Sequence, residues 1–155
     1  MPGAPPNPTR RVPTGEATAW YRDGIRFQCT RCGNCCTGSP GVVRVRDEEI
    51  EALASALDLP DLEFRRRYTR RLRNGDISLI ERSNGDCVFW SPESGCTQYA
   101  QRPRQCQTWP FWKSVVHSRE RWEEEALECP GMNRGALHDR DAVERLAAND
   151  GTRTR

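Results

Sequence analysis

The sequence has few apolar residues and no long apolar run. Only 35% of its 155 residues are hydrophobic, below the roughly 45–50% that is usual for globular proteins when glycine is included. We therefore expect a small core, of the kind that disulfides or metals often supplement. No stretch approaches the roughly 20 apolar residues of a membrane-spanning helix, so we expect no membrane association.

The N-terminus also lacks the apolar centre of a secretory signal peptide. Residues 1–18 are instead rich in proline, glycine and threonine, a composition typical of a disordered tail. Without an export signal we expect a cytoplasmic protein, in which thiols stay reduced. The length favours one domain, which we place over 19–148, with a frayed end over 149–155.

A concentration of charge of one sign is missing too. The 24 Lys and Arg residues nearly balance the 22 Asp and Glu residues, which leaves a net charge of +2. One dense basic run, RRRYTRRLR at 65–73, stands out. We interpret it as the solvated face of an amphipathic helix, and the sequence therefore predicts no nucleic-acid partner.

Short regular elements are expected between the loops. The patterns predict helices over 47–59, 61–72 and 139–148, a short strand over 42–46, antiparallel strands over 77–81 and 87–90 around an Asn-Gly turn, and a second hairpin over 114–118 and 121–128. Asp47 is the expected N-cap of the first helix. The predicted fold class is α+β: a small, irregular, cysteine-rich and metal-stabilised domain with a few helices and short β-hairpins.

Cysteine is the residue type that this sequence has in excess. Four of the eight lie in FQCTRCGNCC, residues 27–36, spaced C-x2-C-x2-C with one more directly after. Two residues between thiolates let a tight turn aim both sulfurs at one ion. Gly33 and Asn34 suit that turn because both tolerate left-handed backbone geometry. The candidate metal ligands are Cys29, Cys32, Cys35, Cys36, Cys87, Cys96, Cys106 and Cys129.

Buried apolar cysteines and disulfides are the alternatives to metal ligation. Burial does not explain four thiols in one loop, and a reducing compartment opposes disulfides. Coordination by sulfur selects zinc, iron or an iron–sulfur cluster, with His117 and His138 as less favoured ligands. Eight thiols exceed the four of one tetrahedral ion, and we expect strain if the adjacent Cys35 and Cys36 share an ion. Two sites, a polynuclear centre and one site with spare thiols all stay open.

Charged and aromatic residues flank the cysteines. Arg31, Arg102 and Arg104 lie close in sequence to candidate ligands and would offset the negative charge of metal-bound thiolates, although they could equally be ordinary surface residues. The aromatic segment WPFW, residues 109–112, is expected to shield the centre from water and fill the core rather than dock a partner.

Four segments together resemble a known family. FQCTRCGNCC, CVFW, GCTQYAQRPRQCQTWPFW and ECPG are similar to the CxxCxxCC or YkgJ-like family, whose members are described as zinc- or iron-chelating domains. The resemblance covers roughly 27–135, and all eight cysteines fall at its motif positions. It implies a cytoplasmic metal-binding protein whose partner is a metal ion or cluster. An iron–sulfur redox or protein-modification component and a metal-delivery protein are the alternatives, and we assign no catalytic residue and no protein partner.

Overall fold

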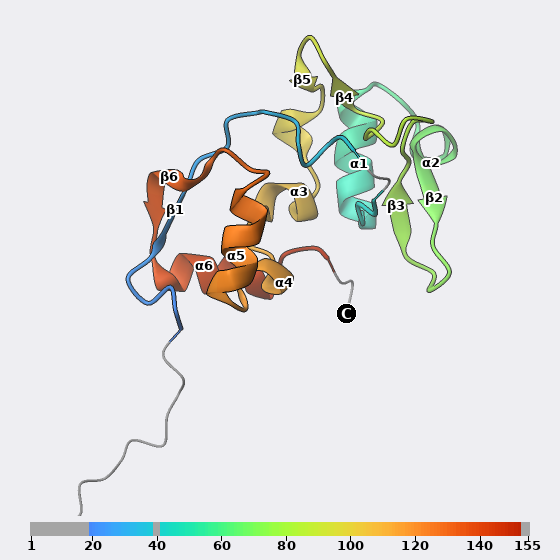
Figure 1. Cartoon of the computed structure of the whole chain (residues 1–155). Helices are drawn as coiled ribbons and strands as arrows, with labels where there is room; N and C mark the ends of the chain where they lie inside the picture. Colours follow the sequence, from blue (N-terminus) through green and yellow to red (C-terminus); the bar gives the residue numbers. More distant parts are fainter. Residues whose placement is uncertain (1–18, 39–40, 153–155) are drawn as a thin grey trace, which may run out of the picture.

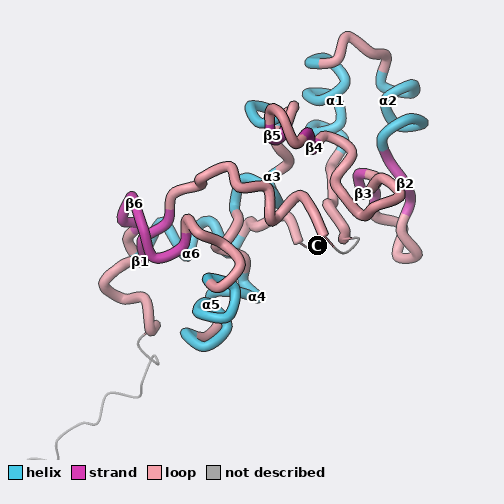
Figure 2. Tube along the Cα trace, turned by 45° about the horizontal axis from the view of Figure 1, so that its top comes forward, coloured by secondary structure: helices cyan, strands magenta, loops and turns pink. Residues whose placement is uncertain are grey.

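The computed structural model describes residues 19–38 and 41–152. Its short helices and two-stranded antiparallel sheets make an α+β fold, as the sequence predicts. The elements gather into two lobes, which lie on either side of α3 (Arg104–Thr108) in Figure 1 and remain separate in the turned view of Figure 2. We call residues 42–91 the helix–hairpin lobe, and residues 19–28 with 109–148 the terminal lobe.

The helix–hairpin lobe packs two helices against a small hairpin. Its elements are α1 (Asp47–Ala56), α2 (Asp61–Tyr68), β2 (Thr69–Arg71) and β3 (Ile77–Leu79). Strands β2 and β3 pair antiparallel, with Thr69 opposite Leu79. The buried core of this lobe consists of Val45, Ile50, Leu53, Ala54, Phe64, Leu79 and Phe89.

The predicted elements of this lobe need several corrections. The helix predicted over 47–59 begins at Asp47 but ends at Ala56. Asp47, the expected N-cap, is its first residue; the N-cap is Arg46, whose N–H donates to the Glu49 side chain at 2.8 Å. The helix predicted over 61–72 ends at Tyr68, since the next three residues pair with β3. Strand 42–46 is reduced to an isolated bridge between Arg44 and Ser78.

The Asn-Gly turn at 84–85 forms, yet the hairpin predicted around it is short. Only Glu81 and Cys87 pair across it as a bridge. Strand β3 pairs instead across the other Asn-Gly turn, at 74–75, where the Asp76 N–H donates to Asn74 Oδ1 at 3.1 Å. The first of two similar turns therefore organises the hairpin.

The terminal lobe is assembled from both ends of the described chain. Strand β1 (Ile25–Phe27) pairs antiparallel with β6 (Met132–His138), and α4 (Lys113–Val116), α5 (Arg119–Ala126) and α6 (Arg140–Ala148) pack nearby. Its buried core consists of Ile25, Phe111, Val115, Val116, Trp122, Met132 and Val143. The aromatic segment at 109–112 thus contributes to the core, as expected.

The hairpin predicted over 114–118 and 121–128 is wrong. Most of those residues form α4 and α5, which are separated by His117 and Ser118. The Ser118 Oγ accepts a hydrogen bond from the Arg121 N–H at 3.1 Å. A serine N-cap followed by Arg, Glu and Ala favours a helix over a strand. The predicted terminal helix is confirmed as α6, and the Asp139 side chain caps it.

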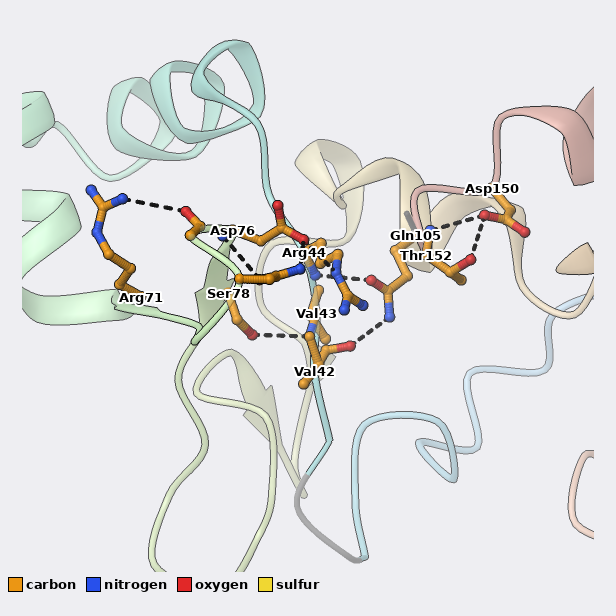
Figure 3. Close-up of polar contacts among 11 residues, drawn as sticks. Val42, Val43, Arg44, Arg71, Asp76, Ser78, Gln105, Asp150 and Thr152 are labelled. Atoms are coloured by element: carbon orange, nitrogen blue, oxygen red, sulfur yellow. Dashed lines mark hydrogen bonds and ion pairs between the residues drawn. The ribbon is translucent and has the colours of Figure 1, made fainter. Parts of the chain in front are cut away.

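Helix α3 connects the two lobes through polar contacts. The buried side chain of Gln105 accepts from the Arg44 N–H at 2.9 Å and donates to the Val42 carbonyl at 2.6 Å, as Figure 3 shows. On the other side, the Thr108 hydroxyl donates to the Asp150 carbonyl at 2.8 Å. Asp150 is buried, although residues from 149 onward were expected to fray.

Three short elements lead into α3. They are β4 (Trp90–Ser91), which pairs with β5 (Gly95–Cys96), and the 3₁₀ helix η1 (Tyr99–Gln101). The predicted tail 1–18 and the last three residues lie outside the described residues. Within residues 19–38 and 41–152, no helix has both the length and the apolar character to cross a membrane.

Candidate metal centre

All eight cysteines line one cavity of about 230 Å³. Phe27 and Cys129 contribute to its wall from the terminal lobe, and Leu79 and Phe89 from the helix–hairpin lobe. Every cysteine is a free thiol. The cavity therefore collects sulfurs from segments as far apart as residues 29 and 129, at the junction between the two lobes.

The loop that carries four of the cysteines depends on two left-handed residues. Arg31 has φ +57°, and its N–H donates to Cys29 Sγ at 3.4 Å. Gly33 has φ +82°, and a Cβ added there would lie 2.1 Å from the Trp90 ring. Glycine is therefore required at 33 both for its conformation and for the close approach of the tryptophan.

The neighbouring thiols of Cys35 and Cys36 lie 3.8 Å apart, sulfur to sulfur. Tetrahedral zinc with Zn–S bonds of about 2.3 Å has sulfur–sulfur edges of about 3.8 Å. The sulfur–sulfur distance is therefore compatible with both thiols at one ion, and the strain expected for adjacent ligands stays a prediction. The pair already has the spacing of one edge of a metal–thiolate tetrahedron.

Backbone contacts hold the remaining cysteines at the same cavity. The Cys87 N–H donates to the Cys36 carbonyl at 2.7 Å, which joins the loop to the helix–hairpin lobe. Cys96 lies opposite Trp90 in the β4–β5 pair. Cys106 lies in α3, and Cys129 follows α5 in the segment that faces the cysteine loop.

Burial and mutual contact shift the pKa values of five thiols. Burial raises the pKa of Cys87, of Cys96 and of Cys106. The hydrogen bond between Cys35 and Cys36 lowers the pKa of Cys35 to about 7 and raises that of Cys36. Negative charge formed at one of these thiols thus opposes ionisation of its neighbours, which a bound cation would offset.

Two arginines stack on one tyrosine at the cavity. The guanidinium carbons of Arg31 and Arg102 lie 3.9 and 3.7 Å from the centre of the Tyr99 ring. Two guanidiniums this close to one centroid need opposite faces of the ring, so Tyr99 lies between them. All three residues line the cavity. Burial raises the pKa of Cys96, and the charges of these arginines oppose that rise.

The predictions for the other flanking residues differ in outcome. Arg104 does not line the cavity; its backbone N–H bonds to Glu49 at 2.7 Å. Neither histidine lines the cavity either: His117 Nδ1 lies 2.8 Å from the Ser114 carbonyl, and His138 packs against the Phe111 ring. Tyr99 was not among the predicted site residues, although it lines the cavity and contacts both arginines. Its place in the sequence between Cys96 and Arg102 was the signal that could have identified it.

The sulfurs surround the cavity rather than meet at one point. Among residues 19–38 and 41–152, no three His, Cys, Asp or Glu side chains are arranged as ligands of a single ion. A cysteine sulfur changes position by rotation about one side-chain bond between staggered positions, so the thiols of this wall are not fixed at the positions seen here. The donor set, which is rich in thiols, fits a soft or borderline metal such as zinc or iron.

Comparison with known proteins agrees with this chemistry. Residues 28–130 match the CxxCxxCC family, described as a "putative zinc- or iron-chelating domain". The chain belongs to this family. It is also similar to the uncharacterized protein MJ0661 of Methanocaldococcus jannaschii, with 32% identity over 100 residues, which are 64% of this chain and 52% of that protein. The chain thus matches about half the length of that relative, and no solved structure matches.

Proposed function

We propose that this member of the CxxCxxCC family is a metal-binding protein whose cysteine thiolates hold zinc or iron between the two lobes. The observation that carries the proposal is that eight thiols, from segments distant in sequence, line one cavity. The proposed ligands are the eight cysteines of that wall. Because the cavity lies where the lobes meet, metal binding would also hold the lobes together.

The residues around the thiols support this function. A bound metal supplies the positive charge that keeps buried thiols ionised. Arg31 and Arg102 add positive charge at the same wall. Trp90, Trp109 and Trp112 line the cavity and limit the access of water. An iron–sulfur cluster is one form of the centre that this wall of thiols favours, and a cytoplasmic location would keep the thiols reduced.

Elemental analysis tests the proposal. The full chain is purified without oxygen, and zinc, iron and acid-labile sulfide are measured per chain together with the visible absorption spectrum. Iron with matching sulfide would identify a cluster, whereas zinc alone would identify a zinc centre. The control is a variant with Cys29, Cys32, Cys35 and Cys36 all changed to Ser. Metal content no higher in the natural protein than in this variant would refute the proposal.

Metal delivery is a second candidate, because part of the thiol wall is accessible. Cys29, Cys32 and Cys35 are exposed, and exposed thiolates exchange metal with a competing ligand faster than buried ones. Transfer of labelled zinc to an apo acceptor protein, faster than spontaneous release into buffer, would support delivery. Transfer no faster than that release would leave the protein as a stable metal holder.

A further inference from the structure

The eight thiols divide into two groups around the cavity. The inner group is attached to the helix–hairpin lobe and α3, and the outer group lies where the cysteine loop meets the terminal lobe. The inner group consists of Cys35, Cys36, Cys87, Cys96 and Cys106, all of them partly buried except the exposed Cys35. The outer group consists of Cys29, Cys32 and Cys129.

A series of contacts connects four of the inner cysteines, each to the next. The Cys35 and Cys36 sulfurs are 3.8 Å apart, and the Cys36 carbonyl accepts from the Cys87 N–H at 2.7 Å. The Trp90 N–H donates to the Cys87 carbonyl at 2.9 Å, and Trp90 pairs with Cys96. These contacts hold the backbone segments that carry the four inner cysteines next to one another along the cavity wall.

The fifth inner thiol, Cys106, is close enough to interact with the others. Burial raises the pKa of Cys106, and three other inner thiols raise it further. The pKa of Cys36 is raised first by its hydrogen bond to Cys35 and also by Cys87 and Cys106. Cys106 lines the same cavity as the other four, and the adjacent Gln105 bonds to Arg44 and Val42, which attaches this part of α3 to the helix–hairpin lobe.

The outer cysteines lie on two segments that run side by side. The Gln28 N–H donates to the Gly131 carbonyl at 3.1 Å, and the Asn34 side-chain amide donates to the Glu128 carbonyl at 2.5 Å. These two bonds hold residues 28–34 against residues 128–131 at both ends. The thiols between them belong to the terminal-lobe side of the cavity.

The size of the cavity also exceeds that of one ion. A single water molecule needs roughly 10–15 Å³ of comparable cavity volume, whereas this cavity has about 230 Å³. One tetrahedral ion takes four sulfur ligands, and the inner group alone has five. Three outer thiols then match the ligand number of zinc sites that keep one position open to exchange.

We propose that the cavity holds at least two metal ions, one bound by the inner thiols and retained, the other bound by the outer thiols and exchangeable. This inference rests on the proposed function, because it requires that the thiols bind metal. It adds a division of labour: the inner ion stabilises the fold, and the outer ion is accessible to an incoming thiol or carboxylate ligand.

Zinc loading and release test the division. The full chain is stripped of metal under reducing conditions and reloaded with Zn²⁺ alone; zinc per chain is measured, followed by release to an excess of a coloured chelator. The outer variant is Cys32→Ser with Cys129→Ser, and the inner variant is Cys87→Ser with Cys106→Ser. We expect about two zinc ions per natural chain, released in a fast and a slow phase of similar amplitude.

The variants should separate the two phases. The outer variant should lose about one zinc and the fast phase, while its circular dichroism and slow phase stay unchanged. The inner variant should lose the slow phase; if it does not fold, the natural protein and the outer variant decide. One zinc per natural chain, a single phase, or an outer variant that loses both phases equally would overturn the division. No zinc binding at all would refute the proposed function itself.

Discussion

The two lobes are of similar core size but are built from the chain in opposite ways. Each has seven buried apolar residues in its core. The helix–hairpin lobe comes from one continuous stretch, 42–91, whereas the terminal lobe needs β1 to pair with β6 more than a hundred residues later. Because contacts between distant residues carry a larger loop-closure cost, we expect the helix–hairpin lobe to form first and the terminal lobe to depend on it.

The comparison explains why the thiols lie where they do. Two cores of this size are each marginal by themselves, since small domains bury too little surface to be very stable. Cys87 and Cys96 pack against the core of the helix–hairpin lobe, and Cys129 packs against that of the terminal lobe. In the proposed division, the inner ion joins the cysteine loop to the helix–hairpin lobe and the outer ion joins the same loop to the terminal lobe, so the two ions together make the stability of each lobe depend on the other.

Metal removal should have the largest effect on this coupling. We expect the metal-loaded protein to unfold in one cooperative transition, and the metal-free protein to unfold at lower temperature in two. Structural zinc contributes on the order of 10 kcal/mol in small domains, so we expect metal removal to eliminate most of the free energy of folding. Calorimetry with and without chelator under reducing conditions measures it. An unchanged single transition after complete metal loss would contradict coupling through the centre.

Truncation of one core at a time should show which lobe depends on which. Phe64→Ala removes a fully buried ring from the helix–hairpin lobe, and Trp122→Ala does so in the terminal lobe. Each should cost about 3–5 kcal/mol. With metal bound, both variants should lower the same transition in thermal unfolding followed by circular dichroism.

The metal-free variants should then behave differently from each other. Trp122→Ala should affect only the terminal-lobe transition, whereas Phe64→Ala should weaken both, because the terminal lobe forms on the other. Near-ultraviolet circular dichroism of the tryptophans, most of which lie in the terminal lobe, measures the terminal-lobe transition in each variant. Equal and independent effects of the two substitutions without metal would argue against the proposed order of assembly.

Alanine substitutions at Gly33 and Gly38 separate the energetic cost of the loop conformation from that of the contact with Trp90. Gly33 and Gly38 have similar φ values, +82° and +95°, but an added Cβ at Gly38 meets no described atom within 4 Å. Gly38→Ala should cost roughly 1–2 kcal/mol for the left-handed conformation. Gly33→Ala should cost about 1–3 kcal/mol more because the Trp90 ring must move. Urea unfolding of the metal-loaded variants measures both; equal losses would show that the ring is not held at the loop.

The gathering of the cysteines was more predictable from the sequence than the bounds of the helices and strands were. Cysteine chemistry is local in its signal: the spacing of Cys29, Cys32 and Cys35 already indicates a turn that aims sulfurs together. That the widely spaced cysteines reach the same cavity followed from their number and from the family resemblance. The sequence did not predict how the thiols divide between the two lobes, because that division depends on contacts between segments that are distant in the sequence.

The errors in the fold have identifiable causes. Two similar Asn-Gly turns compete for β3, and a basic helical pattern that continued past Tyr68 hid the strand that pairs across the first turn. Strand β6 was missed because its partner β1 lies near the other end of the described chain and its solvent-facing residues give a weak alternation. Residues 114–118 and 121–128 were read as strands, although Ser118 and the following Glu and Ala residues favour helix.

The smallest effect should come from the polar connection through α3. Gln105→Ala removes the two hydrogen bonds to Arg44 and Val42 and leaves those partly buried backbone groups unpaired, at a cost of about 1 kcal/mol. Gln101→Ala, at an exposed position of η1, is the matched control and should change little. Amide hydrogen exchange should then rise at Arg44 in the first variant alone. Because Cys106 follows Gln105 directly, the slow phase of zinc release should also become faster. If amide exchange at Arg44 rises but the slow phase is unchanged, the inner thiols keep their positions without this connection.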